Sequence, residues 1–202
     1  GNVVIASTPL IDGTIYYASI SNPANGCESS VRLAVTVNIE DAQTPTTTDT
    51  TQDFCAADLP TVGDIQVDQT GVTFYDAATG GTAYASTDSL VDGATYYASL
   101  TDSASGCESS VRLAITVNIN NAATPTTLDD TPLFCAVDSP TVGDIQMNET
   151  SITFYDAATG GTAYANTDPL VDGTVYYASL TDPVNGCEST TRLAITVTVG
   201  DA

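Results

Sequence analysis

The residues best suited to chemistry in this sequence are five cysteines, which recur with a fixed period. Cys27, Cys107 and Cys187 follow one another at equal intervals of about 80 residues. Cys55 and Cys135 are separated by the same interval. Cysteines form disulfides, bind metals or carry redox chemistry, but no Cys-x-x-Cys motif and no histidine accompanies these five. The pattern therefore favours structural disulfides.

The spacing of the cysteines suggests two ways of pairing them. The interval from Cys55 to Cys107 equals the interval from Cys135 to Cys187, so we expect one disulfide inside each period, worth about 4 kcal/mol in the chain-entropy model. Cys27 then has no partner in this chain. The alternative joins neighbouring periods through Cys27–Cys55 and Cys107–Cys135, and leaves Cys187 unpaired. Either pattern predicts an oxidising, extracellular compartment.

The rest of the composition excludes most catalytic chemistry. The chain has no histidine, no lysine and only three arginines, and its formal net charge is -22. An ordinary general base, a Schiff-base lysine and histidine metal ligands are therefore all missing, so we predict that the protein is not an enzyme. So acidic a surface repels nucleic acid and anionic lipid headgroups. No apolar run reaches the ~20 residues of a membrane span, so no membrane insertion is expected.

Each arginine follows a glutamate by four positions. Positions i and i+4 share one face of a strand, so we expect local ion pairs, with the arginines stacked on tyrosines. The three pairs are Glu28–Arg32, Glu108–Arg112 and Glu188–Arg192.

Calcium is the only cofactor that the sequence leaves open. Converging carboxylates bind Ca²⁺, but no EF-hand or nonapeptide calcium loop is present, and the second linker begins with Asn120 and Asn121 where the first has Glu40 and Asp41. The candidate ligands are Asp64, Asp76, Asp92, Asp144, Asp156 and Asp172 in the repeated segments, and Glu40, Asp41, Asp49, Asp129 and Asp130 near the linkers.

The period of about 80 residues suits a small independent domain rather than a solenoid unit. Two stretches rich in Thr, Pro and Asp, Glu40–Asp53 and Asn120–Pro132, read as linkers or as the start of a first strand. They divide the chain into a half-repeat (residues 1–41), repeat 1 (42–121) and repeat 2 (122–202). The half-repeat matches the back half of a repeat, so the chain is expected to be a piece of a longer protein.

Within a repeat, the pattern is that of short strands. Residues 94–100 and 111–119 are the two strongest candidates, and in the second of them apolar and polar residues alternate. Residues 61–67, 71–77 and 82–85 are further candidates, and Asn-Gly at Asn185-Gly186 marks a hairpin. About seven short strands per repeat predict an all-β chain of tandem antiparallel β-sandwiches.

A tyrosine follows an Asp-Gly turn in each copy, as in the tyrosine corner of immunoglobulin-like sandwiches, where the phenol bonds back to the preceding turn. The candidates are Tyr16, Tyr96 and Tyr176. Their neighbours Tyr97 and Tyr177 would point to the opposite face of the strand.

Taken together, "PTVGDIQ", "GVTFYDAATGGTAYA", "TYYASLTD" and "GCESSVRLAITV" are the segments that carry a family resemblance. The chain resembles the immunoglobulin-like repeats of very large cell-surface proteins of Bacteroidetes, a group that includes the gliding-motility adhesins of flavobacteria. The resemblance covers both repeats and the half-repeat. Members often carry Trp-Tyr where this chain has Phe74-Tyr75 and Phe154-Tyr155.

The resemblance implies a non-catalytic segment of a long adhesin or filament, exported by the type IX system to the surface of a Gram-negative bacterium. Its partners would be neighbouring repeats of the same chain, and surface polysaccharide or the substratum. Three triplets resemble the O-glycosylation acceptors of Bacteroidetes, with Thr50, Ser89 and Ser103 as the modified residues. The alternative is a carbohydrate-binding or other ligand-binding module of a secreted enzyme, which would need an exposed aromatic platform at Tyr96-Tyr97.

Overall fold

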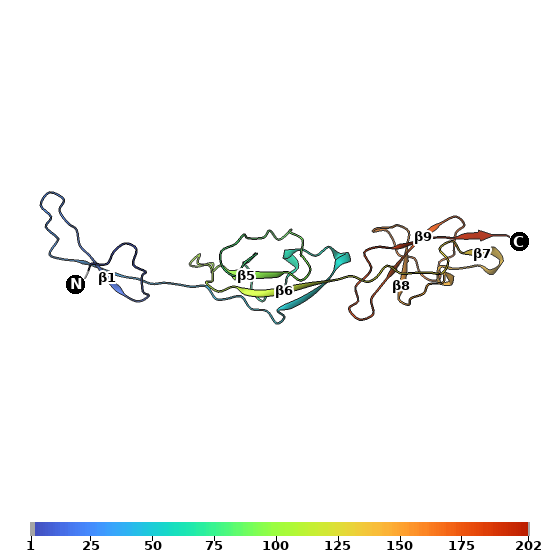
Figure 1. The fold of residues 1–202 in the computed structure, drawn as a ribbon, viewed down its shortest axis with the longest axis horizontal. Coiled ribbons are helices and arrows are strands. Elements are labelled where there is room, and N and C mark those ends of the chain that lie inside the picture. The colour runs from blue at the N-terminus through green and yellow to red at the C-terminus, as the bar shows by residue number, and fades with distance from the viewer. Residues whose placement is uncertain (1–2, 202) are drawn as a thin grey trace.

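The computed structural model describes residues 3–201, so the outer limits of the predicted units, Gly1 and Ala202, lie outside the described residues. Its regular elements are β-strands and single-turn 3-10 helices, which confirms the all-β prediction. Figure 1 shows three bodies that follow one another along one long axis, with the two termini at opposite ends. No helix among the described residues has the length and apolar character needed to cross a bilayer.

The half-repeat consists of a single two-stranded ribbon. Strand β1 (Ile15–Ala18) pairs with β2 (Leu33–Thr36) in antiparallel register, with Ile15 opposite Thr36.

Repeat 1 contains one four-stranded sheet. Its strands are β3 (Thr51–Cys55), β4 (Val72–Tyr75), β5 (Thr95–Leu100) and β6 (Leu113–Asn120). They lie in the order β3-β6-β5-β4, and the β4–β5 and β5–β6 pairs are antiparallel. The first strand, however, runs parallel to the last, which places Cys55 opposite the final residue of β6, Asn120.

Repeat 2 is built in the same way. Its strands are β7 (Leu133–Cys135), β8 (Ile152–Tyr155), β9 (Val175–Leu180), β10 (Leu193–Thr196) and β11 (Thr198–Gly200). The β10-β9-β8 sheet is antiparallel, and β7 pairs in parallel with β11, which places Cys135 opposite Gly200.

The second layer of each sandwich has fewer strands than predicted. No strand forms at residues 61–67, because Val62–Asp64 make a 3-10 turn that is closed by a capping box between Thr61 and Asp64. Residues 82–85 contribute only an isolated bridge between Tyr75 and Ala83. The one-turn helices are η1 (Ala56–Asp58), η2 (Val62–Asp64), η3 (Ala136–Asp138) and η4 (Val142–Asp144).

Both repeats bury the same core. In repeat 1, Val62 and Ile65 from the turn layer pack on Phe74, Tyr96 and Ile115 of the sheet. The counterparts in repeat 2 are Val142, Ile145, Phe154, Tyr176 and Ile195.

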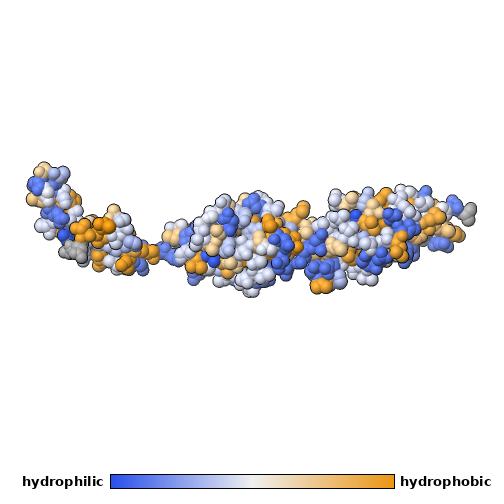
Figure 2. Space-filling view, in the orientation of Figure 1, coloured by the Kyte–Doolittle hydropathy of each residue, from blue (hydrophilic) through white to orange (hydrophobic). Residues whose placement is uncertain are grey.

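The half-repeat has no such turn layer over its ribbon. Val35 is therefore 45% exposed, whereas its counterpart Ile115 is fully buried. Figure 2 shows hydrophobic residues on the surface of this N-terminal body. The front part of a repeat is thus what closes the core over the two strands at its back.

Candidate functional site at the junction between repeats

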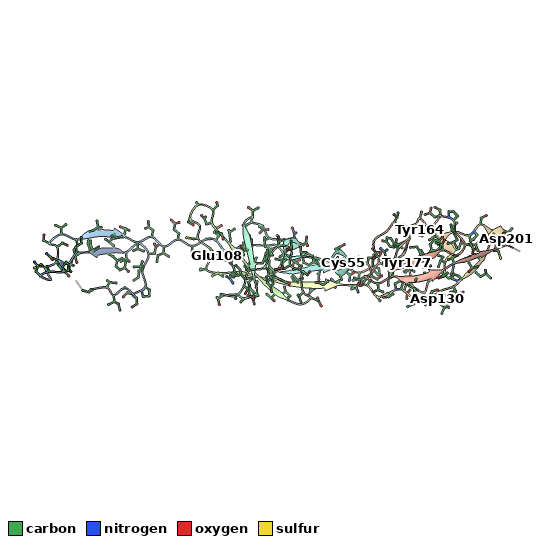
Figure 3. All side chains as sticks on the ribbon, turned by 90° about the horizontal axis from the view of Figure 1, so that it is seen from above. Cys55, Glu108, Asp130, Tyr164, Tyr177 and Asp201 are labelled. Carbon is green, nitrogen blue, oxygen red and sulfur yellow. A yellow bond between two sulfur atoms is a disulfide. The ribbon has the colours of Figure 1, made fainter. Side chains whose placement is uncertain are left out.

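The strand directions place the two cysteines of repeat 1 at opposite ends of the sandwich. Cys55 ends β3 beside Asn120, where β6 leaves the domain. Cys107 lies in the turn closed by the Thr101–Glu108 bridge, before β6 begins. The eight residues of β6 span about 26 Å at ~3.3 Å per residue. Figure 3 labels Cys55 at the end of repeat 1 that meets repeat 2, and Glu108 at the opposite end.

A disulfide crosses the junction between the two repeats. Cys55 of repeat 1 is bonded to Cys187 of repeat 2, with a Cα–Cα distance of 5.2 Å and a sequence separation of 132 residues. Cys187 lies in the turn between β9 and β10, at the end of repeat 2 nearest the linker. The bond thus joins the first strand of repeat 1 to the β9–β10 turn of repeat 2, at the two domain ends that face each other across the linker.

Both predicted pairings are therefore wrong. The intra-repeat bonds Cys55–Cys107 and Cys135–Cys187 fail because a disulfide needs Cα atoms within about 7 Å, and a parallel first strand carries its cysteine to the far end of the domain. The alternative pairing, Cys27–Cys55 and Cys107–Cys135, correctly placed the bond between neighbouring units, but Cys55 is bonded to Cys187 instead. Within the described residues, Cys27, Cys107 and Cys135 carry free thiols.

A hydrogen bond from the linker supports the same junction. Asn121 Oδ1 accepts from the backbone N–H of Thr190, three positions beyond Cys187, at 3.0 Å. The linker residues Ala122 and Pro125 are buried. The linker is therefore partly buried, and one hydrogen bond connects it to the segment that follows Cys187.

The junction between the half-repeat and repeat 1 has the same polar contact. Asp41 accepts from the Ser110 N–H at 2.8 Å and from the Ser110 hydroxyl at 2.5 Å. These hydrogen bonds hold the pKa of the Asp41 carboxyl below its usual value. Cys107 precedes Ser110 by three positions, as Cys187 precedes Thr190, so it occupies the place of the bonded cysteine, with a free thiol.

The three candidate corner tyrosines make the same contact. The Tyr96 hydroxyl accepts from the Val91 N–H at 3.0 Å, just before the Asp92-Gly93 turn. The matching bonds join Tyr176 to Val171 at 3.0 Å and Tyr16 to Ile11 at 3.2 Å. Tyr96 is buried against Tyr84, with ring centroids 5.1 Å apart, so it offers no exposed platform to a sugar.

The arginines stack on tyrosines in the complete repeats. The Arg112 guanidinium carbon lies 3.5 Å from the centroid of the Tyr75 ring, and Nη1 donates to the carbonyls of Ala77 and Gly80 at 2.7 Å. Glu108 is 4.0 Å from Arg112. Hydrogen bonds from the Ser99 hydroxyl and the Tyr75 phenol lower the pKa of the Glu108 carboxyl.

The other two arginines differ in their partners. Arg192 stacks on Tyr155 at 3.4 Å, but it forms no ion pair with Glu188 in the described part of the chain, so that predicted pair is wrong. Its guanidinium instead donates to the carbonyls of Ala157 and Gly160. In the half-repeat, Arg32 and Glu28 form an exposed ion pair at 3.4 Å.

The repeated aspartates serve the backbone at separate turns. Asp64 accepts from Thr61, Asp76 from the N–H of Thr82, and Asp92 from the N–H of Ile119. Across residues 3–201, no three acidic or cysteine side chains gather in a group that could hold a metal ion. Calcium binding remains a prediction. So does O-glycosylation, for which Thr50, Ser89 and Ser103 are exposed.

The two repeats differ beside their first strands. In repeat 1 the buried Gln52 side chain donates to the carbonyls of Asp49 and Gln66 at 3.1 and 2.7 Å, and accepts from the Gln66 N–H at 2.8 Å. The counterpart in repeat 2 is Pro132, which cannot make these bonds. A cavity of about 330 Å³, lined by Leu133, Phe134 and Met147 among others, lies beside it.

Comparisons with known proteins identify the two repeats. The profile of the family described as Ig-like domain CHU_C associated matches residues 43–120 and again residues 123–200. No curated protein matches the chain.

Proposed function

Because this chain belongs to the family of CHU_C-associated Ig-like domains, we propose that it is a spacer segment of a long extracellular adhesin or filament. Tandem Ig-like domains form a non-catalytic structural module, which sets a distance between the parts that they connect. The finer part of the proposal is that this filament is displayed on the surface of a Gram-negative bacterium after type IX secretion. Its first partners are neighbouring repeats, and polysaccharide or the substratum would bind elsewhere along it.

The observation that carries this proposal is the disulfide between Cys55 and Cys187. A bond that joins two consecutive domains limits how far they can bend or separate, which serves a stalk. Disulfides also form and persist mainly outside the cytosol. The elongated arrangement in Figure 1 supports the same role, since the repeats follow one another end to end.

The alternative, a carbohydrate-binding module, finds less support in the residues. Tyr96 is buried, and the ring of Tyr75 is covered on one face by Arg112 at 3.5 Å. We therefore expect the purified chain to give no strong signal on a glycan array. Strong binding to one glycan class would favour the module over the spacer.

Surface display is tested by immunolabelling of intact cells of the source bacterium with antibodies against the folded chain. We expect labelling without permeabilisation, and loss of the label when the type IX system is disabled. Labelling only after permeabilisation would contradict the proposal. Labelling that survives loss of the type IX system would contradict the export route alone.

A further inference from the structure

The disulfide at the junction changes the path that a pulling force takes through the chain. A force applied at the two termini enters through the half-repeat and reaches β3. At Cys55 it can cross directly to Cys187, because the two sulfurs are covalently joined. Residues 56–186 then lie in a closed loop, and the covalent path through the disulfide bypasses them.

The free cysteines Cys135 and Cys107 occupy the positions in their repeats that Cys55 and Cys187 occupy in the disulfide. Cys135 lies opposite Gly200 at the end of β7, as Cys55 lies opposite Asn120 at the end of β3. Cys107 lies three positions before Ser110, which binds Asp41 of the first linker. Thr190, three positions after Cys187, binds Asn121 of the second linker in the same way. Cys135 therefore lies at the end of repeat 2 that is remote from the disulfide, and Cys107 lies at the end of repeat 1 that meets the half-repeat.

We propose that the cysteines of a continuous array bond only across junctions, each with the same sequence separation as Cys55 and Cys187, so that overlapping disulfide loops make the fibre nearly inextensible. Cys135 would bond to the copy of Cys187 one period later, and Cys107 to the copy of Cys55 one period earlier. Because the separation of 132 residues between the bonded cysteines exceeds one period, each loop overlaps the next. Every domain is thus enclosed in at least one loop.

The shortest covalent path through such an array shows the size of the effect. Over every two periods, the path crosses one disulfide and then follows the chain from Cys187 to the next copy of Cys55. This chain segment is as long as the segment from Cys27 to Cys55. Fully stretched, this segment of about 28 residues reaches about 100 Å at ~3.5 Å per residue. Two folded sandwiches already span about 70–80 Å, from their strand lengths and turns. Without the bridges, two unfolded periods would reach about 560 Å.

The bond-forming step needs an oxidant, which a disulfide-carrying thiol oxidase of the cell envelope would supply. A thiolate of one repeat attacks the disulfide of the oxidase and forms a mixed disulfide. The thiolate of the neighbouring repeat then displaces the oxidase. One protein disulfide is gained and one oxidase disulfide is lost, and two electrons and two protons pass from the repeat thiols to the oxidase dithiol.

Single-molecule stretching of the full chain, held at its two ends, tests the load path. We expect unfolding of the oxidised chain to release at most the residues outside the loop, a contour of about 245 Å. The Cys55→Ser variant, or the reduced chain, should reach about 700 Å. Cys135→Ser is the matched control and should behave as the unchanged protein. The inference would be overturned if the oxidised chain extended fully, or if the Cys55→Ser variant extended no further than the oxidised chain.

Pairing along the array is tested with the chain extended by a second copy of residues 123–202, which keeps the period. Oxidised and then alkylated, the chain of five cysteines has three free thiols, and we expect the extended chain to have three as well. Cys135→Ser in the extended chain should raise the number to four. Five thiols in the extended chain, or two in its variant, would overturn the pairing. Neither experiment depends on surface display, so this inference and the proposed function can fail separately.

Discussion

The two junctions of the chain share a polar contact and differ in the covalent one. Asp41 binds Ser110 at the first junction, and Asn121 binds Thr190 at the second, each across 69 residues. Only the second junction joins two units that both contain a first strand, and among the described residues only there does a cysteine find a partner. The comparison shows that the disulfide belongs to a pair of adjacent repeats rather than to any one domain.

The largest effect is expected from Cys55→Ser, which makes the second junction resemble the first. Closing a loop of 132 residues is worth about 5 kcal/mol in the chain-entropy model. We expect the unfolding free energy of the two repeats to fall by up to that amount, measured by guanidinium unfolding without reductant. Cys107→Ser is the control and should leave the transition unchanged. Equal transitions for Cys55→Ser and the unchanged chain would show that the bond does not stabilise the junction.

A second comparison contrasts the first strands of the two repeats. Gln52→Ala removes three hydrogen bonds from a buried site and should destabilise repeat 1 by about 2–3 kcal/mol. Pro132→Gln restores the same side chain in repeat 2 and should stabilise it by about 1 kcal/mol. Hydrogen exchange resolved by repeat measures both effects. Protection of β3 that does not change in Gln52→Ala would contradict this role.

The complete repeats differ from the half-repeat in that their arginines stack on tyrosines. Arg112→Ala removes the Tyr75 contact and two bonds to carbonyls, and should cost about 2 kcal/mol. Arg112→Lys should recover little of it, because an ammonium group lacks the planar fork. Arg32→Ala is the control, since its exposed ion pair is worth about 0–1 kcal/mol. Equal losses in the Arg112 and Arg32 variants, measured by thermal unfolding, would argue against the stacking.

The smallest effect is a loss of stability in acid. The pKa values of Asp41, Asp64 and Glu108 are lowered in the folded chain from ordinary values of 3.8 for aspartate and 4.5 for glutamate. Their hydrogen bonds therefore stabilise the fold above those values, and the contribution is lost as the pH falls through the lower folded-state pKa values. Asp41→Asn copies the second junction and should reduce the acid sensitivity. Unfolding curves between pH 7 and about pH 3 would show this, and an equally acid-sensitive variant would contradict it.

The sequence predicts the central strands of the sheet well, because the pattern that marks a strand lies within the strand itself. Alternation in residues 111–119 anticipates β6, and the strand predicted at residues 94–100 corresponds to β5. It misses the turn at residues 61–67, where a capping box involving Asp64 outweighs the strand pattern. Local patterns also carry no signal for the parallel pairing of β3 with β6, and that pairing decides which cysteines meet. The pairing of Cys55 with Cys187 could have been considered only if the first strand had been placed beside the last.

The most direct measurement of the central claim is peptide mapping of the unreduced protein after cleavage before each aspartate. This cleavage places Cys55, Cys107, Cys135 and Cys187 in four separate peptides, 53–57, 102–128, 130–137 and 182–200. We predict one linked pair, between peptides 53–57 and 182–200, which separates on reduction. A link between peptides 53–57 and 102–128 would contradict a bridge between repeats and restore a bridge within each of them.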